Sequence, residues 1–363
     1  MSLLTTNYLT PTGREEAWRF TPLKRLKGLH DGSAIIGGRA SLAPKSALPI
    51  GVTFQRLARE LISSQSATDD VIIERIRGQA IDCAVLSIAA NTEVAQPIYL
   101  KRAMGDTDTA ELSRVQIRLA EHARATVIFE NNGDALLAED VEIILSPGSN
   151  LKFITLQEWN ATSVHTARHH AIIDKDAVFK SVTVTVGGDL VRILPTVEFI
   201  GSGSSAELLG VYFATTGQFF EHRMHIDHLV PNAKSRVDYK GALAGKGAHT
   251  VWIGDVFIRA AAAGTDTYEL NRNLLLTDGA RADSVPNLEI ETGEIVGAGH
   301  ASTTGRFDDE QLFYLMSRGI TLADARRLVV RGFFNEIISE IGSEEIQDRL
   351  MSRIDSELAK AGS

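Results

Sequence analysis

The longest stretch of the chain consists of short apolar runs in which apolar and polar residues alternate. From about residue 82 to residue 297, Pro-Gly, Asn-Gly, Asp-Gly and Gly-Gly pairs separate these runs, and helix signals are weak. A period of two is typical of strands that bury one face, and such pairs are typical of tight turns. The pattern therefore predicts a mainly β protein, and we place its β core at residues 82–307.

A small residue that precedes an alternating run recurs along this core. It begins the segments ARATVIF at 123, SNLKFITL at 149, AVFKSVTV at 177, AELLGVYF at 206, AKSRVDYK at 233, AHTVWIG at 248 and ARADSVPNLEIE at 280. The steps from 123 to 233 are 26, 28, 29 and 27 residues, and the last two steps are 15 and 32 residues. A nearly constant period with a turn before each small residue favours a solenoid over a β-sandwich. We therefore predict a parallel β-helix.

The region before this core has the pattern of loops and short helices. REEAWRFTPLKRL at 14–26 mixes charged and aromatic residues, and FQRLARELISS at 54–64 places apolar residues on one face of a helix. We therefore predict an N-terminal helical segment over residues 1–81.

The last part of the chain, residues 308–363, predicts a helical domain of three amphipathic helices. The first helix ends at Gly319, Thr321 caps the second, and a Gly-Ser pair separates the second from the third. Apolar residues follow one another at steps of three and four. In the second helix Phe333 and Phe334 point about 100° apart. One internal core does not satisfy both, so we expect part of this apolar surface to meet a partner.

Composition narrows the classes of function. The chain has 363 residues, a formal net charge of −9 and one cysteine, Cys83. Negative charge does not favour nucleic acids or anionic membranes, and one cysteine excludes an internal disulfide or a cysteine-rich metal cage. Residues 1–12 lack a secretory signal, and the apolar runs are far shorter than the roughly 20 residues that span a bilayer. We expect a cytoplasmic protein.

The sequence offers little for catalysis. It has no GxxxxGK[ST] phosphate loop, no nucleophile elbow and no evident pair of carboxylates. We therefore expect no enzymatic activity. Two alternatives remain, which are a carbohydrate-active β-helix enzyme, needing paired carboxylates in a cleft, and a self-associating structural protein.

The histidines fall into three groups. HTARHH at 165–170 and HRMHIDH at 222–228 lie in predicted strands, and alternation puts His225 on the opposite face from its two neighbours. Structural roles on polar sheet faces are favoured for both groups over metal ligation. His300 is different, because it stands among glycines, alanines and small hydroxyl residues in GEIVGAGHASTTG at 293–305.

Several segments resemble the SufB/SufD family of iron–sulfur cluster assembly proteins. PNLEIETGEIVGAGHASTTGRFDDEQLFYLMSRGI at 286–320 is similar to the signature segment of the family, and EEAWRFTPLKRL at 15–26 to the N-terminal motif of its SufD members. NRNLLLTDGARADSVPNLEIE at 271–291 and RGFFNEIISEI at 331–341 also resemble family segments. The resemblance implies a right-handed parallel β-helix flanked by N-terminal and C-terminal α-helical segments.

The resemblance also implies a scaffold function in the SUF system. SufD members pair with SufB through their β-helices, each of the two binds a SufC ATPase through its C-terminal helices, and the nascent cluster forms at the interface of SufB and SufD. The chain is more similar to SufD, because Gly299 and Ala301 stand where SufB members carry acidic residues. SufB members are also longer and richer in cysteine.

Residue roles follow from the same resemblance. His300 takes the place of the signature histidine, which implies a position at the cluster-assembly interface and a transient ligand to an iron–sulfur cluster. Ala298 stands where some SufD members carry cysteine, which argues against direct sulfur chemistry. The implied SufC-binding residues on the second C-terminal helix are Phe333, Phe334, Ile337 and Ile338. No cofactor is expected to bind tightly, and the isolated chain is free to form a homodimer.

Overall fold

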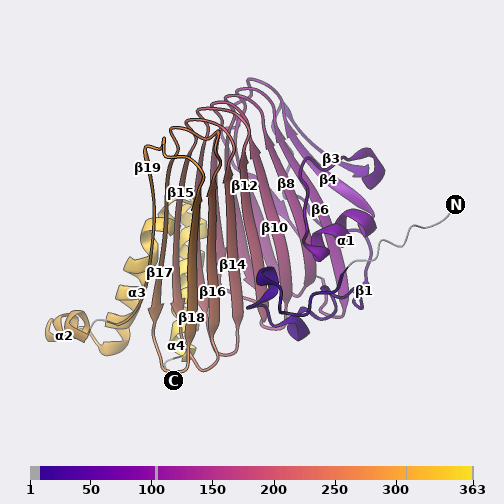
Figure 1. The fold of residues 1–363 in the computed structure, drawn as a ribbon. Helices are drawn as coiled ribbons and strands as arrows, with labels where there is room; N and C mark the ends of the chain where they lie inside the picture. Colours follow the sequence, from indigo (N-terminus) through magenta and orange to yellow (C-terminus); the bar gives the residue numbers. More distant parts are fainter. Residues whose placement is uncertain (1–8, 103–104, 308, 362–363) are drawn as a thin grey trace.

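Two long, mostly parallel sheets face each other and form a β-solenoid of about eight turns (Figure 1). The structure is a computed structural model and describes residues 9–102, 105–307 and 309–361. From β4 to β19, successive strands belong alternately to the two sheets, so that each turn contributes one strand to each. The predicted parallel β-helix is confirmed.

The first sheet, sheet A, has ten strands in the order β18-β16-β14-β12-β10-β8-β6-β4-β3, with β1 beside β6. Their bounds are β1 Ile35–Ile36, β3 Val52–Ala58, β4 Asp82–Ile88, β6 Thr109–Leu119, β8 Leu136–Leu145, β10 Val164–Ile173, β12 Leu190–Phe199, β14 Phe219–His228, β16 His249–Ile258 and β18 Arg281–Ile290. Only β3 runs antiparallel to its neighbour. It closes the N-terminal end of the sheet.

The second sheet, sheet B, has nine strands in the order β19-β17-β15-β13-β11-β9-β7-β5-β2. Their bounds are β2 Ala43–Pro44, β5 Ile98–Lys101, β7 Arg124–Gly133, β9 Asn150–Trp159, β11 Val178–Thr185, β13 Ser205–Ala214, β15 Lys234–Leu243, β17 Asp266–Leu275 and β19 Gly297–Arg306. Only the short β2 is antiparallel to its neighbour. Both sheets therefore end in an antiparallel strand on the N-terminal side.

The repeated small residue of the sequence fills one corner of the solenoid. Its members are fully buried and are Ala123, Ser149, Ala177, Ser204 and Ala233. The residue before the small residue has a positive φ, as at His122, Asp176 and Asn232, because the chain turns there. At the fourth turn Ser204, not Ala206, occupies the corner. Ala248 precedes a strand of sheet A and belongs to the other corner, which explains the irregular step of 15 residues.

Except for α2, the long helices lie on part of the outer face of one sheet or the other (Figure 1). Their bounds are η1 Glu16–Trp18, η2 Leu23–Leu26, η3 Arg59–Leu61, α1 Val71–Gln79, α2 Asp309–Ser317, α3 Leu322–Ser339 and α4 Glu344–Ala361, where η marks a 3₁₀ helix. One apolar cluster fills the solenoid between the sheets. A second joins α3 and α4 to the outer face of sheet B, and a third joins η2 and α1 to the outer face of sheet A. The fold therefore has four layers around one long core.

The N-terminal segment contains less helix than predicted. The expected helix over residues 54–64 is wrong, because β3 takes its first half and only η3 continues it. Phe54 and Leu57 have helical spacing, but the free edge of β4 offers seven residues of antiparallel pairing. Pairing with that edge outweighs local propensity. Residues 14–26, for which loops and short helices were expected, form η1 and η2.

The C-terminal helices begin and end where the sequence predicts. Gly319 adopts a φ of 87° after α2, and the Thr321 hydroxyl accepts a hydrogen bond of 3.1 Å from the Asp324 amide at the start of α3. Gly342, with a φ of 75°, separates α3 from α4. The α2 helix extends away from the sheets (Figure 1). These signals are local, so the sequence alone places them correctly.

Candidate functional site

His300 lies on β19, the last strand of sheet B. Its register partner on β17 is Glu269, and Ala298 pairs with Thr267. Side chains of register partners in a parallel sheet share a face. Thr267 and Glu269 are buried inside the solenoid, so His300 continues an interior-facing row. Its side chain is nevertheless exposed, because no strand in the described part of the chain pairs with the outer edge of β19.

The glycines around His300 are not all required by the chain's own packing. A β-carbon at Gly299 would approach the Tyr268 ring to 3.1 Å, so that position favours glycine. At Gly297 and Gly305, a β-carbon would meet no heavy atom of the described residues within 4 Å. The small residues at these two positions therefore leave open space along the edge, where another molecule can approach the backbone.

Both sheets end unpaired at this side of the solenoid. Across residues 9–102, 105–307 and 309–361, no strand pairs beyond β18 in sheet A or β19 in sheet B. The opposite end differs, since β2 and β3 close it. Ile290 and Val296 lie at the unpaired end and are 45 % and 75 % exposed. We call β18, β19 and their connection, residues 281–306, the open end.

Glu269 is a candidate site residue that the sequence did not reveal. It is 1 % exposed, and neither carboxylate oxygen has a hydrogen-bond partner among the described residues. Burial, with a smaller contribution from the charge of Asp255, raises the pKa of Glu269 to about 8. An unpaired buried carboxylate is costly, so it favours a proton or a cation.

The sequence contains one signal that could have identified Glu269. It precedes His300 by 31 residues, which is the length of the last turn measured along sheet B. In a solenoid, residues one period apart become neighbours. Counting back one turn of the solenoid from His300 would therefore have identified Glu269. No residue next to His300 in the sequence supplies a carboxylate.

Four of the six clustered histidines lie inside the solenoid, not on polar outer faces as predicted. These interior histidines are His165, His169, His222 and His228, whereas His170 and His225 face outward. The His222 Nε2 atom lies 3.0 Å from the Thr185 hydroxyl, and the ring stacks on Tyr212. Burial lowers the pKa of His222 to about 3. The expected separation of His225 from His222 and His228 is confirmed.

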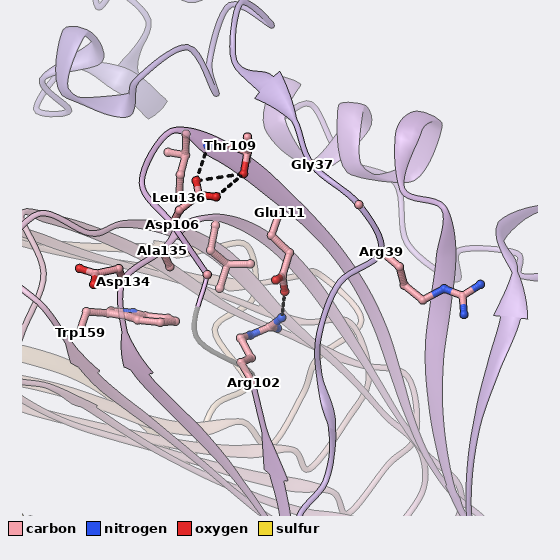
Figure 2. Close-up of a pocket in the computed structure, with 14 residues that line it drawn as sticks. Gly37, Arg39, Arg102, Asp106, Thr109, Glu111, Asp134, Ala135, Leu136 and Trp159 are labelled. Carbon is pink, nitrogen blue, oxygen red and sulfur yellow. Dashed lines mark hydrogen bonds and ion pairs between the residues drawn. The ribbon is translucent and has the colours of Figure 1, made fainter.

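A pocket of about 100 Å³ near the first turns bears on the enzyme alternative, because Glu111 and Arg102 are among the residues that line it (Figure 2). Arg102 forms ion pairs with both Glu111 and Glu139. Burial of Glu139 opposes ionisation, but the Arg102 charge and the His165 imidazole, whose Nε2 atom lies 3.7 Å from Oε2, outweigh it and lower the pKa of Glu139 to about 2. A carboxylate with so low a pKa is no general acid near neutral pH. The carboxylates paired with Arg102 therefore do not support the enzyme alternative.

Three of the four residues predicted to bind the ATPase are buried in the chain's own core. Phe334, Ile337 and Ile338 pack on the outer face of sheet B. Phe333 is only partly buried, and the Lys240 ammonium lies 5.6 Å from the centre of its ring. While α3 stays on the sheet, Phe333 is the member of this group that a partner can touch.

The described residues contain no group of three or more His, Cys, Asp or Glu side chains placed to hold a metal ion. None of their helices is both long enough and apolar enough to cross a membrane.

Comparison with known proteins identifies the family. Residues 102–333 match the SufBD core domain, described as SUF system FeS cluster assembly. An iron–sulfur cluster assembly SufBD family protein of Mycobacterium tuberculosis is 49 % identical over 358 residues, which cover 96 % of this chain and 89 % of the relative. A Mycobacterium leprae protein of that description is 46 % identical, covering 96 % and 90 %. The iron–sulfur cluster assembly protein SufD of Escherichia coli is 26 % identical, covering 96 % and 89 %. The chain therefore belongs to the SufBD family of iron–sulfur cluster assembly proteins.

Proposed function

We propose that this chain is the SufD-type scaffold subunit of the SUF machinery. Its open end pairs with a SufB subunit, and the nascent iron–sulfur cluster forms at that interface beside His300. The observation that carries the proposal is the exposed imidazole of His300 on an interior-facing row at the unpaired end of the solenoid. Imidazole is a suitable ligand for iron and can replace a thiolate at a cluster.

The unpaired strands supply a physical reason for pairing there. An edge strand presents free N–H and C=O groups, which a strand of another chain can satisfy. Both β18 and β19 are ten residues long, so a partner solenoid can continue both sheets. The space at Gly297 and Gly305 allows its backbone to approach closely.

The C-terminal helices provide a surface for the SufC ATPase. We assign the contact to Phe333 together with the exposed aromatic residues of α2, Phe313 and Tyr314, which are 73 % and 57 % exposed. Phe334, Ile337 and Ile338 then have a different role, because they fix α3 to sheet B. A partner that moves α3 therefore acts on the sheet that carries His300.

In this assignment the chain is a scaffold, not an enzyme, and it works in the cytoplasm. The cluster is cargo and no resident cofactor is required. The net charge of −9 favours neither nucleic acids nor anionic membranes as partners.

Coexpression with SufB and SufC of the same organism tests the proposal. We expect native mass spectrometry to detect a complex with one copy of this chain, one SufB and two SufC. The matched variant His300→Ala should assemble equally well but form less cluster on reconstitution. A chain that forms only homodimers in the presence of SufB would contradict the proposal, and cluster formation at the wild-type rate by the variant would make His300 structural.

A further inference from the structure

Glu269 is left unexplained by a scaffold function alone. Its carboxylate is buried, and both oxygens lack hydrogen-bond partners among the described residues. Glu139, a second buried carboxylate of the interior, is by contrast paired with Arg102. Burying the ionised carboxylate without a partner is strongly unfavourable, so the group holds either a proton or a cation. A cation that takes the place of the proton would compensate the charge of the carboxylate.

Glu269 and His300 are direct register partners on adjacent strands. Neighbouring strands lie about 4.8 Å apart, so the two side chains leave the sheet side by side and enter the same row. One member of the pair is a buried carboxylate and the other is an exposed imidazole. Together they lead from the surface of the open end into its interior.

The facing sheet makes room for the carboxylate. A β-carbon at Gly254 of β16 would lie 2.5 Å from Oε1 of Glu269 and 2.7 Å from the Trp252 ring, so glycine at this position leaves room for both side chains. Ser284 of β18, which faces the interior from the opposite sheet, also has a buried hydroxyl without a hydrogen-bond partner in the described residues. Polar atoms without partners therefore lie in the last two turns, which carry Glu269 and His300.

We propose that Glu269 and His300 together bind a divalent cation, with the carboxylate as the buried anionic ligand and the imidazole as the exposed ligand. The remaining coordination positions belong to solvent or to the partner subunit. Carboxylate oxygen and imidazole nitrogen suit ferrous iron. The identification of the cation as ferrous iron rests on the proposed function, whereas the site itself rests on the geometry.

Titration of the purified full-length chain with ferrous iron alone, under anaerobic conditions, tests this inference by calorimetry. We expect one cation to bind per chain. Glu269→Gln keeps the shape of the side chain and removes its charge, and it should weaken binding at least tenfold, as should His300→Ala. Glu121→Gln, in an exposed turn, makes the matched change in charge far from the site and should bind as the wild type does.

A second variant keeps the test valid if Glu269→Gln does not fold. Gly254→Ala leaves the charge in place but forces the carboxylate to move, so it should also weaken binding. Absence of iron binding by the wild-type chain would overturn the inference. Unchanged iron affinity in both Glu269→Gln and Gly254→Ala would also overturn it. Either result leaves the pairing with SufB intact, since that is measured separately by the composition of the complex.

Discussion

The closed body of the solenoid and its open end use the same residue type in opposite ways. His222 lies on an interior row of the body, stacked on Tyr212 and in contact with the Thr185 hydroxyl. His300 lies on an interior-facing row of the last turn, where no further strand among the described residues covers it. Burial makes the first histidine a packing element. The end of the sheet makes the second available for chemistry.

Glycines also have different roles in the closed body and at the open end. In the body, a β-carbon at Gly241 would lie 1.9 Å from the Tyr212 ring, so glycine is required by internal packing. At the open end, a β-carbon at Gly297 would meet none of the described heavy atoms within 4 Å. A residue type therefore indicates function only when its place in the stack of turns is known.

The largest expected effect is the difference in stability between alanine variants of two adjacent phenylalanines of α3. Phe334→Ala should lower the free energy of unfolding by about 3–5 kcal/mol, because its ring is fully buried against sheet B. Phe333→Ala should change stability by less than about 1 kcal/mol but weaken SufC binding roughly thirtyfold. Denaturant unfolding and calorimetry measure the two quantities. Equal losses of stability in both variants would remove the distinction between core and docking surface.

The next largest effect is the difference in stability between alanine variants of Gly241 and Gly297. Gly241→Ala should lower the free energy of unfolding by about 1–3 kcal/mol, because the new methyl group overlaps the Tyr212 ring. Gly297→Ala should leave it within about 0.5 kcal/mol and weaken pairing with SufB. Thermal unfolding of the isolated chains and titration with SufB measure both. A Gly297 variant that pairs normally would show that the partner does not approach this edge closely.

A smaller effect concerns cluster formation. His300→Ala should reduce the cluster formed on the reconstituted complex on the order of tenfold, while the free energy of unfolding stays unchanged, because the side chain is exposed. Iron and sulfide analysis of the reconstituted complex gives the first quantity. If the variant is instead destabilised and loses no cluster, His300 belongs with the interior histidines.

The smallest effect is the pH dependence of a single buried histidine. The pKa of His222 is lowered to about 3 by burial, so the unfolded chain binds the proton first as the pH falls below about 6.5. Stability is therefore complete above that pH and is lost as the pH decreases. For one histidine the loss is about 1 kcal/mol between pH 6.5 and 5.5. This contribution of His222 to the pH dependence should be absent in His222→Phe. An identical pH dependence of the free energy of unfolding in both proteins would contradict the assignment.

Much of the fold was predictable because its signals repeat. The period of 26 to 29 residues gave the solenoid, and Gly319 and Thr321 gave the helix boundaries. The helix over 54–64 was predicted wrongly, because that segment pairs as β3 with the edge of β4. The two strands are neighbours in space but are separated in the sequence, so no local pattern indicates their pairing. Local patterns indicate turns and caps, but they do not indicate which sheet edge needs a partner.

The site was predictable only in part for a similar reason. His300 stood out by its neighbours, whereas Glu269 is distant in sequence and becomes adjacent only through the register of β17 and β19. Phe334 was expected to meet a partner, but the outer face of sheet B already covers it. Helical spacing identifies an apolar face and does not tell whether that face packs on the same chain or on another.

Site-directed cross-linking tests most directly the claim that SufB pairs with the open end. The native thiol of Cys83 is buried, and burial raises its pKa to about 12, so it does not compete for a thiol reagent. Ser302→Cys places a thiol on the exposed part of β19, and Thr53→Cys places one on the exposed part of β3 at the closed end. With a short thiol cross-linker and no iron, we expect Ser302→Cys to cross-link to SufB and Thr53→Cys not to. Cross-linking from Thr53→Cys alone would contradict the account.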